Sequence, residues 1–173
     1  MLLNLAPGAY TAHISPKAGT GVIVAELYEA MLNPNSVCQR LVNISSRGQV
    51  TGGEGVLIGG FVVSGNAPKK LLIRGVSPRL TAFRLSGALD KPRLTVFSEA
   101  TPLGENDDWS AVATDRAARS TASTQTGAFA LTPGSKDASL ILTLAPGAYT
   151  AQITPADGAS SGSALIEIYE IPQ

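Results

Sequence analysis

The chain contains one stretch of twelve residues twice. Residues 5–16 and 144–155 are identical at ten of the twelve paired positions and lie 139 residues apart. A second match follows each stretch, because residues 24–29 resemble residues 165–170 at a separation of 141. A repeat predicts that both copies form the same local structure. We call residues 5–29 the first copy and residues 144–170 the second copy.

Both copies predict strands that meet at a corner. Apolar and polar residues alternate in each, and a period of two is typical of a strand with one buried face. The Leu-x-Pro-Gly-x-Tyr spacing resembles a tyrosine corner, whose Tyr hydroxyl bonds to backbone a few residues upstream. The structural corner residues are therefore Pro7, Gly8 and Tyr10, and Pro146, Gly147 and Tyr149. Stacking of a ligand on the tyrosines is the alternative.

The composition indicates an all-β globular chain. Hydrophobic residues make up 44% of the 173 residues and charged residues 15%, which excludes a disordered chain. Gly and Pro separate short apolar runs throughout. We expect an antiparallel β-sandwich of Greek-key or jelly-roll type, with about eight or nine short strands and at most one short helix.

Between the copies, the pattern predicts further strands at residues 40–45, 56–63, 69–76, 93–97, 127–131 and 139–144. The glycines at 59 and 60 predict a bulge or a bend. A helical turn is expected near residues 79–83, and residues 110–126 form either a loop or one short helix.

The chain divides at a polar Pro/Asn segment. Residues 32–39 are predicted to be a linker. Residues 40–173 then form a complete β-sandwich module of ordinary domain size. Residues 1–31 correspond to the closing strands of a preceding or neighbouring repeat.

No catalytic constellation is found in the sequence, and we expect no enzyme. His13 is the only histidine, and residues 40–173 contain none for a catalytic triad. Because Cys38 is also the only cysteine, a zinc site lacks its set of ligands. The net charge is zero, and no basic stripe predicts nucleic-acid binding. No run of ~20 apolar residues predicts a membrane span. The first residues lack the pattern of a signal peptide, which fits a mature secreted chain or a piece of a longer one.

One acidic stretch has oxygen ligands for calcium. Asn106, Asp107 and Asp108 cluster there, and calcium binds 6–8 oxygens in such loops. The alternative is an Asx turn, in which the side chains bond to following backbone amides. Trp109 either packs over an edge of the sandwich or binds sugar. We expect no other cofactor and no small-molecule ligand.

Several strings together resemble a known kind of module. These are residues 40–48, 56–65, 72–78 and 106–109 and the Pro-Gly-Ala-Tyr-Thr-Ala corner. They resemble a β-sandwich repeat found in tandem, or at the ends of large secreted bacterial proteins that often carry immunoglobulin-like domains. A looser similarity is to β-sandwich domains appended to secreted bacterial peptidases, some of which bind calcium. The resemblance implies an extracellular or cell-surface, non-enzymatic role.

The duplicated closing strands predict assembly with copies of the chain or adjacent repeats. An uncovered strand is a template for association. The expected strand donors are Leu5, Tyr10, Ala12, Ile14, Ile23, Ala25 and Leu27. The first copy completes either a preceding repeat in a tandem array or a neighbouring chain in a filament, or it packs on its own module as an extra hairpin. The other function considered is a calcium- or glycan-binding accessory module of a secreted enzyme or adhesin.

Overall fold

The computed structural model describes residues 2–15, 17–19, 21–29 and 40–172. The chain divides into two compact units, residues 1–41 (unit 1) and residues 42–173 (unit 2). Each is described by itself. The expected linker 32–39, with Cys38, lies outside the described residues.

Unit 2 consists of eight strands and two helices. In chain order these are β1 (Asn43–Val50), β2 (Leu57–Val63), β3 (Lys69–Val76), the 3-10 helix η1 (Pro78–Phe83), β4 (Pro92–Ser98), β5 (Thr101–Asn106), α1 (Ala113–Thr126), β6 (Ala138–Leu144), β7 (Gly147–Pro155) and β8 (Gly162–Glu170). Gly/Pro turns separate most strands, as the sequence predicted. The expected all-β architecture is confirmed, with somewhat more helix than the single short one expected.

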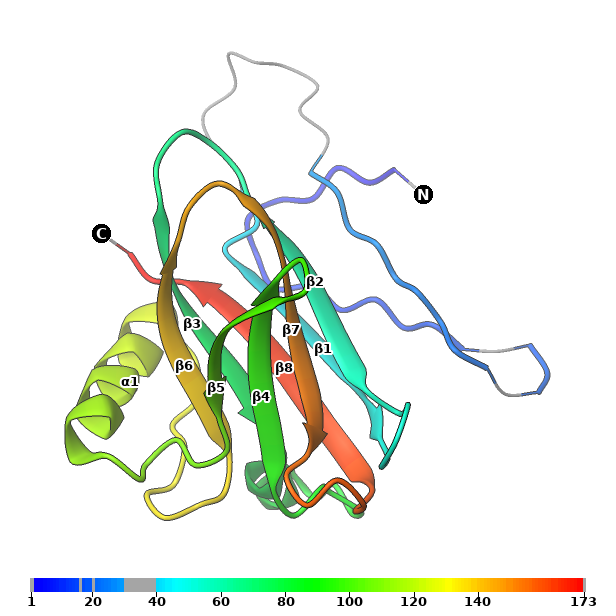
Figure 1. The fold of residues 1–173 in the computed structure, drawn as a ribbon. Helices are drawn as coiled ribbons and strands as arrows, with labels where there is room; N and C mark the ends of the chain where they lie inside the picture. The colour runs from blue at the N-terminus through cyan, green and yellow to red at the C-terminus, as the bar shows by residue number, and fades with distance from the viewer. Residues whose placement is uncertain (1, 16, 20, 30–39, 173) are drawn as a thin grey trace. The chain divides into compact units, whose positions relative to one another are not determined.

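The strands form two antiparallel four-stranded sheets. One has the order β1-β8-β3-β6 and the other the order β2-β7-β4-β5 (Figure 1). The pairs β1–β2, β7–β8, β3–β4 and β5–β6 thus hold matching positions in the two sheets. This order is that of a jelly roll, the type of sandwich that the sequence predicted. The last two strands of the chain are therefore inner strands, one in each sheet.

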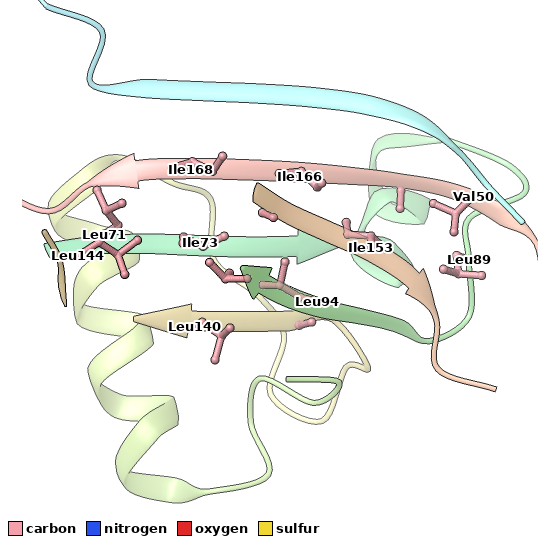
Figure 2. Packing of buried hydrophobic residues seen from close by; sticks show 14 of the residues in the cluster. Val50, Leu71, Ile73, Leu89, Leu94, Leu140, Leu144, Ile153, Ile166 and Ile168 are labelled. Carbon is pink, nitrogen blue, oxygen red and sulfur yellow. The ribbon is translucent and has the colours of Figure 1, made fainter. Parts of the chain in front are cut away.

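The main core lies between the two sheets. Val50, Ile73, Leu94, Ile153 and Ile166 are at most 1% exposed and belong to five different strands. Figure 2 shows such side chains gathered between the strands. Alternation along each strand places every second residue here, which is the cause of the period of two.

Helix α1 covers part of the outer face of the β1-β8-β3-β6 sheet (Figure 1). Its Ala122 packs with Leu72 of β3 and Ile171, beside Tyr169 of β8. The helix ends at Gly127, which adopts a left-handed φ of 73° that an L side chain disfavours. The middle of this sheet is therefore covered on both faces.

One expected strand is absent, and one strand was not predicted. Residues 127–131 form no strand, because Gly127 and Ala128 cap helix α1 through hydrogen bonds to Thr124 and Ser123. Residues 101–106, for which no strand was predicted, form the edge strand β5. In addition, β1 begins at Asn43 and extends to Val50, beyond the expected 40–45.

Unit 1 forms no helix or strand in its described residues. Every described residue between 2 and 29 is exposed, including the apolar side chains Leu5, Tyr10, Ile14 and Leu27. The alternating pattern that predicts half-buried strands is thus present without burial. Elsewhere as well, the part of the chain that the structure describes holds no helix long and apolar enough to cross a membrane.

Candidate functional site

The second copy shows the environment for which the repeated sequence is suited. Its strand β7 pairs with β2 and β4, and its strand β8 pairs with β1 and β3. Each therefore uses its backbone groups on both edges (Figure 1). Without β7 and β8, neither β1 nor β2 would have a neighbour in its own sheet. The first copy carries the same sequence pattern, and we take it as the candidate site.

The corner has the same geometry in both copies. The Tyr149 hydroxyl donates to the Ala145 carbonyl at 2.8 Å, and the Tyr10 hydroxyl donates to the Ala6 carbonyl at the same distance. Each tyrosine side chain lies over the glycine two residues earlier: a Cβ on Gly147 or Gly8 would come within 3.6 Å of a ring carbon of Tyr149 or Tyr10. In unit 2 the ring also stacks on Phe61 of β2, at 5.6 Å between centroids.

The turn after the corner also repeats. Gly158 has a φ of 74°, and Gly19, at the same separation of 139, has a φ of 77°. Such a left-handed conformation favours glycine. The side chain before it differs, because Asp157 stands where the first copy has Ala18. Hydrogen bonds from the Ser160 side chain and nearby backbone amides lower the pKa of Asp157 to about 2 from the ordinary 3.8.

The inward face of the second copy is apolar and buried. Ala151, Ile153, Ala164, Ile166 and Ile168 are at most 6% exposed. Their counterparts in the first copy are apolar too, namely Ala12, Ile14, Ile23, Ala25 and Leu27. The two copies differ in how exposed these side chains are, because Ile153 is 0% exposed whereas Ile14 is 53% exposed. These are the expected strand-donor residues, and in unit 1 their side chains lie in solvent.

One pair of core positions exchanges its bulk between the copies. Ala164 and Ile166 correspond to Ile23 and Ala25, so small and large are reversed while the total volume is kept. Ile166 lies against β2, where a Cβ on Gly59 would be 3.0 Å from its Cγ2 atom. A partner of the first copy therefore needs space for a large side chain two residues earlier in the strand, opposite Ile23 and not opposite Ala25.

A glycine of the repeat is required in one copy only. A Cβ on Gly162 would lie 2.4 Å from the Leu89 backbone nitrogen, so only glycine fits at the start of β8. Gly21, its counterpart at the separation of 141, has nothing within 4 Å of a Cβ. The first copy thus keeps a residue that its own surroundings do not require.

Strand β8 also carries a buried ion pair on its outer face. Arg74 of β3 stands directly opposite Glu167, and its Nε donates to the Glu167 Oε2 atom at 2.9 Å. The guanidinium also donates to the Phe129 carbonyl at 2.6 Å and lies 4.4 Å from the centre of the Phe129 ring. Its side chain is 0% exposed and that of Glu167 is 6% exposed.

A tyrosine completes this cluster. The Tyr169 hydroxyl donates to the Glu167 Oε1 atom at 2.7 Å. Burial, and next the Glu167 charge, raise the pKa of Tyr169 well above its ordinary value, so the hydroxyl stays a donor. Both carboxylate oxygens of Glu167 are therefore occupied, which is what a buried charge needs.

The first copy keeps the acidic and aromatic members of the cluster. Glu26 and Tyr28 correspond to Glu167 and Tyr169, and the Tyr28 hydroxyl donates to the Glu26 Oε1 atom at 3.2 Å. Within the described ranges no ion pair involves Glu26. The strand-donor prediction left out Gly21, Glu26 and Tyr28, although their repetition in the sequence was the signal that could have found them.

The residues of the acidic stretch diverge. Asn106 accepts from the Ser139 amide at 2.9 Å, and Asp107 pairs with Lys91 at 2.7 Å. Asp108 accepts from the Ser110 amide at 2.9 Å, which is an Asx turn. Among the described residues no three His, Cys, Asp or Glu side chains form a group that could hold a metal. Calcium binding stays a prediction, tested by a melting shift in millimolar calcium that Asp107→Ala and Asp108→Ala abolish.

Two further residues from the sequence can be placed. Trp109 is 3% exposed, and its Nε1 donates to Ser135 Oγ at 3.1 Å and to the Thr132 carbonyl at 3.2 Å. This is the packed position that was one of its two interpretations. His13 is exposed, on the parity opposite to that of Ala12 and Ile14.

Comparisons with known proteins add little. No protein family and no curated protein matches the sequence. A solved structure that is similar is the pre-peptidase C-terminal domain of collagenase from Bacillus anthracis, with 11% identity and a TM-score of 0.44 over 73% of this chain and 89% of that chain. Similarity at this level supports no statement about function.

Proposed function

We propose that the protein is a non-enzymatic structural module of a series, in which the first copy forms the two closing strands of the preceding module. Residues 8–15 would take the place of β7 there, and residues 21–29 the place of β8. The partner is then a set of six strands equivalent to β1–β6. At each junction in the series, the first copy would complete the module before it, while the second copy completes its own module.

The observation that carries this proposal is that the first copy keeps residues that unit 1 itself does not need. Gly21 is required only beside a loop such as the one containing Leu89. The inward residues Ala12 and Ile14 match positions that are fully buried in β7. A free, solvated segment needs none of these residues, whereas an inner strand of a jelly roll needs all of them.

An intact copy of the same chain is a poor partner. In unit 2 both inner places are filled by β7 and β8, each paired on both edges. The first copy can enter only where these places are empty. A preceding repeat in a tandem series meets this condition directly, while a second chain meets it only after releasing its own residues 147–170.

A joined chain tests the proposal. Residues 42–144 are fused ahead of residues 6–173, which restores the Leu-Ala-Pro-Gly sequence at the junction. We expect amides of residues 8–15 and 21–29 to be protected from hydrogen exchange to about the same extent as those of β7 and β8. A second version with Ile23→Ala and Ala25→Ile gives the first copy the same order of small and large side chains as Ala164 and Ile166. Exchange of these amides at the rate of an unfolded peptide in both versions would overturn the proposal.

A second arm distinguishes the two sources of the partner strands. The full chain and a chain without residues 1–31 are compared by sedimentation at high concentration. Association of the full chain alone indicates that a separate chain supplies the strands. If both stay monomeric while the joined chain folds its added module, the strands come from the same polypeptide.

An extracellular or cell-surface location belongs to this proposal. It is supported by the resemblance of the repeat strings to tandem modules of secreted bacterial proteins.

A further inference from the structure

We infer that Glu26 and Tyr28 form a selective receptor for one arginine of the partner's third strand. This inference rests on the proposed function and specifies the partner. The arginine would stand opposite Glu26 on the adjacent strand, as Arg74 stands opposite Glu167. Only a six-strand set with arginine in that register would then accept the first copy well.

The pairing geometry in unit 2 defines what the arginine must meet. Glu167 accepts two hydrogen bonds from Arg74 through Oε2, while Tyr169 occupies Oε1. In unit 1 the equivalent half already exists, because Tyr28 donates to the same oxygen of Glu26. The other carboxylate oxygen is the one that corresponds to the arginine-bound Oε2. The acceptor half thus keeps its arrangement outside a sheet.

Because this pair is buried, it would discriminate between partner strands with and without the arginine. In unit 2 the pair lies under the Phe129 ring on the outer face of an inner strand, with Arg74 0% exposed. A carboxylate placed there without its cation is strongly disfavoured, since removing one partner leaves an uncompensated buried charge. Glu26 therefore opposes insertion beside a strand with an apolar residue in place of the arginine. Apolar strand donors alone, such as Ala25 and Leu27, would not discriminate in this way.

The outer face around the pair supports the same reading. Val24 and Tyr28, which flank Glu26, are each 81% exposed. Their counterparts Leu165 and Tyr169 pack into clusters on the outer face of the sheet. The residues on both faces of β8 thus recur in the first copy. This is expected for an inner strand that is covered on both faces, and not for an edge strand.

The joined chain provides the test, with hydrogen exchange of residues 21–29 as the readout. Glu26→Gln should speed exchange of these amides on the order of a hundredfold, the effect of breaking a buried pair. The matched control is Glu29→Gln. Its counterpart Glu170 pairs with Lys69 at 3.0 Å at a partly exposed site, so the change should stay below about fivefold.

Arginine recognition is isolated by a double variant. Replacing the arginine at the Arg74 position of the added strands by Met should weaken protection as Glu26→Gln does. Combining this change with Glu26→Gln should restore most of the protection, because an uncharged pair can be buried. If the amides of the parent are protected but Glu26→Gln and Glu29→Gln have equally small effects, the inference is overturned while the proposed function stands. Absence of protection in the parent and in its Ile23→Ala, Ala25→Ile version would overturn the proposed function.

Discussion

The two copies of one sequence have different structures in this protein. In the second copy, β7 and β8 are inner strands with neighbours on both edges. In the first copy, the described residues form no strand, yet the Tyr10 corner and the left-handed Gly19 match Tyr149 and Gly158 closely. Turns and corners are therefore encoded locally, by Pro, Gly and a tyrosine four residues from its acceptor. Strands are encoded as a pattern that requires partners.

The largest expected difference between the copies is at their matched core isoleucines. Ile153→Ala should destabilise unit 2 by about 2–5 kcal/mol, because it removes buried methyl groups and leaves a cavity. Ile14→Ala in the same chain should change the free energy of unfolding by less than about 0.5 kcal/mol. Urea denaturation followed by fluorescence of the buried Trp109 measures both. Equal effects would mean that the first copy is buried after all.

The glycines at the start of the second strand should separate the copies next. Gly162→Ala should cost about 1–3 kcal/mol, because the new Cβ would strike the Leu89 backbone. Gly21→Ala should be within about 0.5 kcal/mol of the parent, since open space surrounds it. Melting temperatures of the two variants check this. In the joined chain we expect Gly21→Ala to become as harmful as Gly162→Ala.

The corner hydroxyls should give a smaller contrast. Tyr149→Phe removes the hydrogen bond to Ala145 and should destabilise unit 2 by about 0.5–1.5 kcal/mol. Tyr10→Phe should leave the melting of unit 2 unchanged and alter only the corner of unit 1. Hydrogen exchange at Ala9 and Tyr10 reports that local change. A loss of unit 2 stability with Tyr10→Phe would contradict the separation of the two roles.

The smallest contrast is the response of the turns to acid. Asp157 has a folded pKa of about 2, lowered from 3.8, so its carboxylate form favours the folded turn. That contribution is present above pH 3.8 and is lost as the pH falls through about 2. Amides of Ala159 and Ser160, which donate to this carboxylate, should open over that range. Asp157→Asn should remove the dependence, and the turn with Ala18 should show none.

The sequence was sufficient for the elements with local signals. Strands β2 and β3 lie almost where the apolar runs 56–63 and 69–76 predicted them, because turn residues bound both. Strand β5 was missed, since its Pro, Gly and acidic residues are typical of a loop and it lies at an edge. Residues 127–131 alternate like a strand, but their apolar side chains cover helix α1, Arg74 and Trp109.

The glycines of β2 show a second limit. Gly59 and Gly60 predicted a bulge or bend, but β2 pairs with β7 in an unbroken register. Gly59 instead makes room for Ile166 of the opposite sheet. The ion pair was equally hidden, because Arg74 and Glu167 are separated by 93 residues. Contacts of this kind depend on which strands face each other, and a single sequence does not contain that information directly.

The position of β7 and β8 also sets the order in which a module can be completed. Within unit 2 these strands are synthesised last, yet β8 joins β1 to β3 and β7 joins β2 to β4. A growing chain that has reached Leu144 has all six other strands but two unfilled gaps, with unpaired edges in both sheets. Nearly all pairing partners of the final strands are distant in sequence, which slows folding and exposes intermediates. Closure of the sandwich therefore waits for its C-terminal end, and until then the nascent module is open to any strand pair that fits.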